Sequence, residues 1–228
     1  MRCLLWAAVA LLLAGCGGAG EENGSAELWI TRDRGSQVLH EATVPAGLTV
    51  MQALKREVEL ETRYGGRFVQ SIDGLEGSLE GGRDWFFFVN GVASDRGAAE
   101  YRLRDGEVAW WDFRRWRGED EVPVVVGAFP EPFLHGYDGE RRPAHVRYER
   151  AAQAGVARKL GRLIRAASVR PSSVSVPAGG NALVLRGHRG LSAEADSPRG
   201  PYRFVLGGDA AALARDPKLV RFRFEGLP

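Results

Sequence analysis

The sequence is poor in cysteine, because its 228 residues include only two, Cys3 and Cys16. Both lie in a stretch where a basic start precedes an unbroken apolar run, Leu4 to Leu13, and then Leu13-Ala14-Gly15. This order predicts a secretory signal cut before Cys16, with an apolar run shorter than the roughly 20 residues that span a bilayer. Without Cys3 and with Cys16 modified, the chain has no free thiol. Disulfides, thiolate metal sites and cysteine nucleophiles are then excluded.

Residues 13–16, Leu-Ala-Gly-Cys, resemble the bacterial lipobox. The resemblance implies diacylglycerol on the Cys16 thiol and a protein anchored to the cell membrane on its extracytoplasmic side. Each buried methylene of the lipid would contribute about 0.8 kcal/mol to the anchoring. An ordinary signal peptide followed by a chance cysteine is the alternative. If Cys16 carries lipid, residues 16–26 form a lipidated tether, and their small, polar composition predicts flexibility.

An excess of charge of one sign is also lacking, since 31 Lys and Arg stand against 29 Asp and Glu. This mixture predicts a soluble surface and no nucleic-acid partner. The sequence has no P-loop, no nucleophile elbow and no positioned pair of acids. Its histidines lack the spacing of a zinc site; they are His40, His135, His145 and His188. We therefore expect no metal, no cofactor and no enzymatic activity, although an enzyme that uses residues 122–228 is a third interpretation.

Hydrophobic periodicity predicts a first unit over residues 27–117. Two strands, 28–31 and 38–44, precede a helix over 48–60, where Thr49 and Gln52 have the spacing of a capping box. Further strands follow at 67–72, 85–89 and 107–113, and Asn90-Gly91 predicts a tight turn after the second of these. Two strands, one helix and several strands predict an α+β fold: a β-grasp-like domain with one helix packed on a mixed sheet.

A polar joint at residues 118–122 leads into a second unit, a small α/β domain over residues 122–228 of no recognised family. Its predicted elements are a buried strand over 122–127, a strand over 144–148, a helix over 151–167, strands over 182–186 and 202–206, a short helix from 209 to 214, and a last strand over 219–224.

Three blocks of the first unit carry a family resemblance: residues 64–74 (YGGRFVQSIDG), 84–91 (DWFFFVNG) and 101–110 (YRLRDGEVAW). Together they resemble the C-terminal β-domain of transcobalamin and intrinsic factor, and more closely the uncharacterised bacterial export proteins that share this domain. The resemblance covers about residues 27–116, somewhat under half of the chain. It implies the β-grasp fold and, as a ligand, cobalamin or a related corrinoid. Nothing in the chain resembles the α/α barrel that completes the corrinoid site in transcobalamin.

Aromatic residues are concentrated on the strands 85–89 and 107–113. Since side chains alternate between the two faces of a strand, one aromatic set must pack on the helix. The other set is either covered by the second unit or exposed, in which case it could stack on a flat ligand, a sugar or a partner protein. The candidate ligand-binding residues are Tyr64, Ile72, Trp85, Phe87, Asn90 and Trp110.

The sequence thus predicts a membrane-anchored extracytoplasmic lipoprotein that acts as a small-ligand-binding module. The ligand would be cobalamin or another corrinoid, or the protein would be an accessory to an uptake transporter. The alternative is a structural or interaction lipoprotein that docks on another envelope protein or on a cell-wall polymer, without a small ligand.

Overall fold

The computed structural model describes residues 24–116, 122–187, 190–208 and 210–224. The predicted signal, Cys16 and most of the predicted tether lie outside these residues. So does Asp209, the predicted start of a short helix. No helix among the described residues has the length and apolar character needed to cross a membrane.

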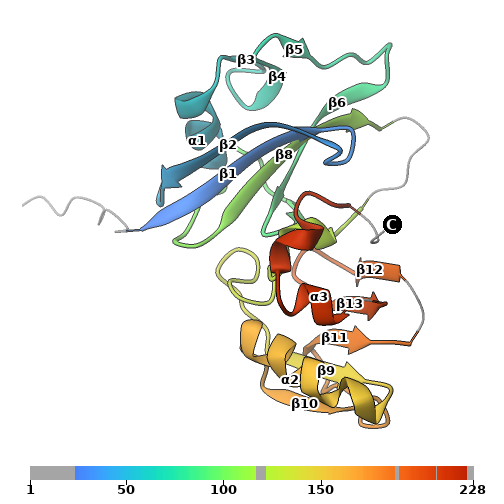
Figure 1. Cartoon of the computed structure of the whole chain (residues 1–228). Coiled ribbons are helices and arrows are strands. Elements are labelled where there is room, and N and C mark those ends of the chain that lie inside the picture. The colour runs from blue at the N-terminus through green and yellow to red at the C-terminus, as the bar shows by residue number, and fades with distance from the viewer. Residues whose placement is uncertain (1–23, 117–121, 188–189, 209, 225–228) are drawn as a thin grey trace, which may run out of the picture.

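The first unit contains a five-stranded sheet in the order β2-β1-β8-β6-β7, a three-stranded antiparallel sheet β3-β4-β5 and the helix α1 (Figure 1). Strands β1 and β8 are parallel, and their neighbours pair antiparallel. The elements are β1 (Ser25–Arg32), β2 (Gln37–Pro45), α1 (Val50–Glu57), β3 (Leu60–Arg63), β4 (Phe68–Ile72), β5 (Leu75–Glu76), β6 (Arg83–Val89), β7 (Val92–Ala93) and β8 (Val108–Arg115).

Helix α1 begins as the sequence predicts. The Thr49 side chain accepts a hydrogen bond from the Gln52 amide, and the Gln52 side chain accepts one from the Thr49 amide, at 3.1 and 2.8 Å. These two bonds satisfy amides that have no partner within a helix, so the capping box is confirmed. The helix buries Val50, Ala53 and Leu54 against the mixed sheet, and the α+β class is confirmed.

The second unit is built on a five-stranded sheet in the order β10-β9-β11-β13-β12. Its first four strands are parallel, and β12 pairs antiparallel at the edge. The elements are η1 (Val126–Ala128), β9 (Ala144–Tyr148), η2 (Ala151–Gln153), α2 (Ala154–Leu163), β10 (Ser168–Pro171), β11 (Asn181–Leu185), β12 (Gly190–Ala195), β13 (Tyr202–Gly207), α3 (Ala210–Leu213) and η3 (Pro217–Val220).

Two strands predicted in the second unit are wrong. In place of a strand over 122–127, Val124 forms a single bridge with Val92 and the chain then turns into η1. In place of a strand over 219–224, η3 is followed by Phe222, whose φ of 64° lies in the left-handed region. Apolar residues alternate with arginines at 219–224, which is typical of a strand. In the structure this segment pairs with none of the described strands, and the side chains of Phe222 and Phe224 pack against the first unit instead.

The two units share one hydrophobic core. It runs from Leu54 and Val92 of the first unit through Phe133 to Phe204 in the centre of the second sheet. The rings of Phe133 and Phe204 lie 5.0 Å apart with their planes nearly perpendicular. Because buried residues of both sheets contribute to this core, the units pack directly on each other (Figure 1).

Candidate functional site

The six predicted ligand-binding residues do not form one surface. Tyr64 is 80% exposed at the turn between β3 and β4, and Phe87 is half-buried against Trp111. The other four are at most 4% exposed and lie in the interior: Ile72, Trp85, Asn90 and Trp110. In this conformation a ligand cannot reach these four side chains.

The second unit covers the aromatic face that points away from α1. Phe88 of β6 and Trp110 of β8 are both 0% exposed. The ring of Phe224 lies 5.3 Å from that of Phe88 and 5.2 Å from that of Trp110, and Phe222 lies 6.2 Å from Trp110. Of the two alternatives that the sequence left open, the second aromatic face is therefore covered and not exposed, because the C-terminal segment packs its phenylalanine rings against it.

Asn90 connects the units. Its side-chain amide donates to the Gly136 carbonyl at 2.8 Å and accepts from the Val108 amide at 2.9 Å. Its φ of 53° lies in the left-handed region, which Asn tolerates better than most residues. The Asn90-Gly91 turn thus fixes the first unit against the loop before β9.

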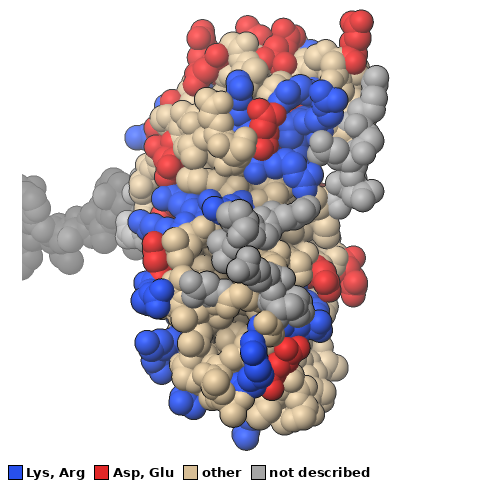
Figure 2. All heavy atoms as spheres, turned by 45° about the vertical axis from the view of Figure 1, so that its right-hand side comes forward, with Lys and Arg blue, Asp and Glu red and all other residues tan. Residues whose placement is uncertain are grey.

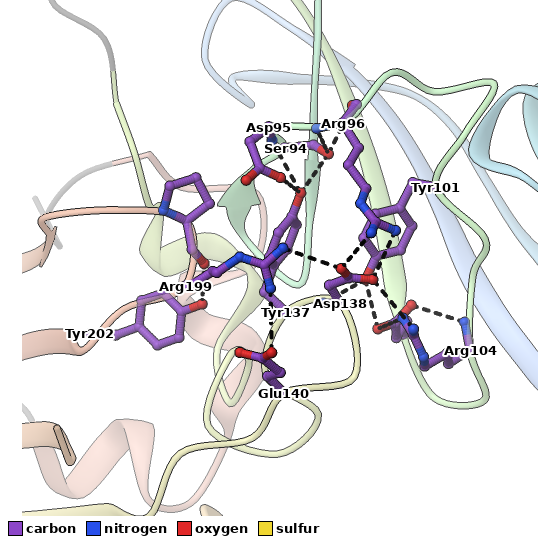
Figure 3. A network of polar contacts seen from close by, with 12 residues as sticks. Ser94, Asp95, Arg96, Tyr101, Arg104, Tyr137, Asp138, Glu140, Arg199 and Tyr202 are labelled. Atoms are coloured by element: carbon purple, nitrogen blue, oxygen red, sulfur yellow. Dashed lines mark hydrogen bonds and ion pairs between the residues drawn. The ribbon is translucent and has the colours of Figure 1, made fainter.

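A polar network surrounds this junction (Figure 3). Asp138 receives guanidinium groups from both units: Arg96 at 3.0 Å, and Arg104 and Arg199 at 3.4 Å each. The Tyr137 hydroxyl donates to Asp95 at 2.6 Å. The Asp138 side chain is 11% exposed whereas its three arginine partners are 41–45% exposed, so these contacts lie at the edge of the junction, where they link the two units.

Trp110 has a polar role beneath the surface. Its indole Nε1–H donates to the Thr31 hydroxyl at 2.8 Å, and that hydroxyl donates to Asp112 at 2.6 Å. Asp112 also accepts from the backbone amides of Arg34 and Gly35, at 3.1 and 3.0 Å. Burial raises the pKa of Asp112, although these hydrogen bonds oppose the shift. The chain of contacts fixes the turn between β1 and β2.

That turn forms one wall of a pocket of about 490 Å³, and the segment Arg221–Phe224 forms the other. The lining residues are Arg34, Gly35, Ser36, Arg221, Phe222, Arg223 and Phe224. The two walls are in close contact, because a Cβ placed on Gly35 would lie 1.6 Å from the Phe222 carbonyl oxygen. Only glycine allows this approach, and its φ of +76° also favours glycine.

Guanidinium groups and aromatic rings dominate the lining of this arginine pocket. Arg221 lies 4.4 Å over the Trp29 ring and is held by Glu41 at 2.7 Å and Glu27 at 3.2 Å. Arg34 lies 5.3 Å over the Phe224 ring. Arg223 takes part in no ion pair among the described residues. Such donors suit a carboxylate or phosphate, and none of the described lining residues carries an imidazole or carboxyl group for acid–base catalysis.

A second pocket of about 530 Å³ lies on the other side of Phe224. It is lined by Val122, Val124, Gly190, Leu191, Ser192, Ala193 and Phe224, and is therefore mostly apolar. Within the described ranges, no group of three or more His, Asp or Glu residues has the geometry to hold a metal ion.

Sequence reasoning missed the arginine pocket. The sequence predicted a strand over residues 219–224 and gave no site at the turn that lies beside it in space, residues 34–36. The available signal was the order Arg221-Phe222-Arg223-Phe224, in which basic and aromatic side chains alternate. That order does not reveal where the segment packs.

Residues 47–115 match the model of a domain of unknown function, DUF4430. The match lies within the first unit. Among curated proteins, no sequence matches the chain.

Two solved structures are similar to parts of the chain. Haptocorrin in complex with Cbi matches at 18% identity and a TM-score of 0.35, over 41% of this chain and 25% of haptocorrin. A candidate metal-binding protein from Ruminococcus gnavus ATCC 29149 matches at 14% identity and a TM-score of 0.32, over 41% of this chain and 99% of its own. The chain thus spans a quarter of haptocorrin.

Proposed function

We propose that the protein is an extracytoplasmic lipoprotein, anchored by lipid on Cys16, that binds a small anionic ligand in the arginine pocket and catalyses no reaction. The observation that carries the proposal is the convergence of Arg34, Arg221 and Arg223 on one pocket with phenylalanine walls. The order of residues in the predicted signal supports the location.

The chemistry of the pocket favours an anion with an apolar part. A guanidinium group offers a planar fork of donors that matches a carboxylate or a phosphate with two parallel hydrogen bonds. Phe222, which is half-buried, offers apolar surface next to these donors. A volume of about 490 Å³ lies within the usual range for small-molecule sites, roughly 300–1,000 Å³.

A corrinoid is the specific ligand that we propose, because the sequence resemblance to transcobalamin and intrinsic factor implies it. Cobalamin carries a phosphodiester, and this group has the charge and shape that the arginine pocket accepts. Only this part of cobalamin would enter the pocket. A module of this kind, held near the membrane, would suit an accessory of an uptake transporter.

Titration calorimetry tests the ligand. Inorganic phosphate, a dicarboxylate and cobalamin are titrated into the mature chain with Cys16→Ser, and into the same chain with Arg223→Gln or Arg215→Gln. Arg215 is an exposed arginine of the same unit that does not line the pocket. Loss of one charge-assisted hydrogen bond costs about 1.5–3 kcal/mol, so Arg223→Gln should weaken binding by roughly 10–100-fold and Arg215→Gln should not. Equal weakening by both variants, or no binding of any of the three ligands, would refute the pocket.

Mass spectrometry of the membrane fraction tests the location. The proposal expects an N-terminal peptide that begins at Cys16 and carries the mass of its lipid, and expects Cys16→Ser to leave this fraction. An unmodified Cys16, or cleavage at another residue, would contradict it.

A second function, docking on an envelope protein without a small ligand, is favoured by one surface. Tyr64 is 80% and Phe68 47% exposed, and their rings form an edge-to-face pair 6.4 Å apart on the sheet β3-β4-β5. Exposed aromatic pairs of this kind occur at interfaces. In pull-downs from membranes, Tyr64→Ser with Phe68→Ser should release a partner under this hypothesis, while Arg223→Gln should retain it.

A further inference from the structure

Charge is unevenly divided between the two units. Residues 122–228 contain 17 Lys and Arg but nine Asp and Glu, whereas residues 27–117 contain 13 and 15. The balance of the whole chain hides this difference. Figure 2 shows acidic side chains gathered at the top, over the first unit, and basic side chains both over the first unit and along the lower end of the second.

The basic charge is concentrated on the helix α2 and the neighbouring edge strand β10. Arg158 and Arg162 are exposed and stand four residues apart on α2, which places them on one side of the helix, and the exposed Arg165 follows in the turn after α2 ends at Leu163. Lys159 and Arg170 are exposed beside them. We call these five residues the α2 face. It lies at the end of the molecule that is farthest from the first sheet (Figure 1).

Packing and pairing leave this face open to solvent. The opposite side of α2 buries Ala157, Leu160 and Gly161 against the second sheet. Several other basic residues of the second unit have acidic partners, such as Arg186 with Glu149 at 3.6 Å and Arg199 with Glu140 at 3.5 Å. No ion pair between described residues includes any member of the α2 face.

We propose that the α2 face docks on the anionic phospholipid headgroups of the membrane that carries the lipid anchor. Charge complementarity selects this partner: juxtamembrane Lys and Arg gain about 1 kcal/mol each at an anionic bilayer surface. The lipid on Cys16 would hold the chain at the membrane, and a basic patch on the protein would add electrostatic attraction to anionic lipids. The inference rests on the proposed extracytoplasmic location, and it adds an orientation, with α2 towards the bilayer.

Vesicle sedimentation tests the α2 face without the lipid. The mature chain with Cys16→Ser is mixed with vesicles of equal parts phosphatidylglycerol and phosphatidylcholine, or of phosphatidylcholine alone. Binding to the anionic vesicles only is expected, and it should fall between about 0.15 M and about 1 M salt as the Debye length shrinks from about 8 to 3 Å.

Matched variants locate the effect. Arg158→Gln, Arg162→Gln and Arg165→Gln together should lower the partition coefficient about 100-fold, at roughly five-fold per charge. The control removes the same charge from exposed positions of the first unit, with Lys55→Gln, Arg56→Gln and Arg67→Gln, and should change binding little. The corresponding Arg→Lys triple should retain binding. Retention by the Arg→Lys triple would show that the positive charge is what binds the vesicles. Thermal unfolding of each variant shows whether a loss of binding reflects a less stable helix.

Three results would overturn the inference: equal binding to neutral vesicles, an equal loss in the control triple, or retention by an anionic polymer such as polyphosphate without binding to anionic vesicles. The last result would assign the face to a polyanion. Failure of the anion titration at the arginine pocket would leave the vesicle result unchanged. An unmodified Cys16 in cells would refute the proposed lipid anchor, whereas the vesicle assay would still test lipid binding by the α2 face.

Discussion

Replacing Gly35 by alanine should loosen the C-terminal segment from the first unit. The added Cβ would lie 1.6 Å from the Phe222 carbonyl oxygen and 2.7 Å from its carbon, so the segment must move by about 2 Å to reach ordinary contact. Alanine at a left-handed φ costs about 1–2 kcal/mol by itself. Movement of the segment would also expose part of Phe224, which is 4% exposed, and full removal of a buried Phe costs about 3–5 kcal/mol.

We therefore expect Gly35→Ala to lower the free energy of unfolding by about 3–5 kcal/mol, of which the clash and the lost burial contribute more than half. Gly74→Ala is the matched control, because Gly74 has a φ of +78° and nothing within 4 Å of its Cβ position. It should cost about 1–2 kcal/mol. For a chain of this size 1 kcal/mol shifts Tm by about 2–4 °C, so Gly35→Ala should unfold about 10 °C below the wild type.

Thermal unfolding gives the two Tm values, and limited trypsin digestion followed by mass spectrometry gives the location of the change. Trypsin cleaves after arginine, so a displaced segment should be cut faster at Arg221 and Arg223 in Gly35→Ala than in Gly74→Ala. Anion binding at the arginine pocket should fall in Gly35→Ala alone. Equal Tm values and equal cleavage rates in the two variants would refute the packing of the C-terminal segment on the turn between β1 and β2.

Three further predictions concern buried polar contacts. Trp110→Phe should lower stability by about 1–3 kcal/mol in urea unfolding, because it removes the indole donor from a buried hydroxyl, whereas Trp116→Phe at a 37% exposed site should cost little. Asn90→Ala should cost more than Asn90→Gly, since both lose the side-chain bonds to Gly136 and Val108 but only alanine is strained at a φ of 53°. Equal costs would contradict this account. Hydrogen bonding to Glu131 raises the pKa of His135 above its ordinary value of 6.5. The pair therefore stabilises the fold fully below pH 6.5, and this contribution is lost as pH rises through the raised pKa. His135→Gln should destabilise the protein more at about pH 6 than at about pH 9, and the reverse order would be inconsistent with the ion pair.

Much of the local structure followed from the sequence. The capping box at Thr49 and Gln52 set the start of α1, and the alternation on β6 assigned Trp85 and Phe88 to opposite faces. The strand β9 was predicted at its observed bounds, Ala144–Tyr148. These features depend on residues close together in the chain, so their spacing carries the information. Short strands such as β7 and β10 were missed, because two to four residues give too little periodicity.

The candidate site was predicted less well, for a physical reason. An aromatic strand must bury at least one face, but its own sequence cannot tell whether the second face meets water or another part of the chain. Trp110 was therefore assigned to ligand binding, while its surroundings are Phe224, some hundred residues later, and Thr31. Contacts at that separation have no periodic signal.

The sequence by itself determined the β-grasp-like unit, the likeness of residues 13–16 to a lipobox and the absence of a recognisable catalytic motif. Tertiary structure decided which surfaces remain for function. It buried the aromatic face, joined Arg34 with Arg221 and Arg223 around one pocket, and left the basic side of α2 in solvent. Burial and charge patches arise where distant segments meet, and close approaches such as that of Gly35 to Phe222 select which segments can meet.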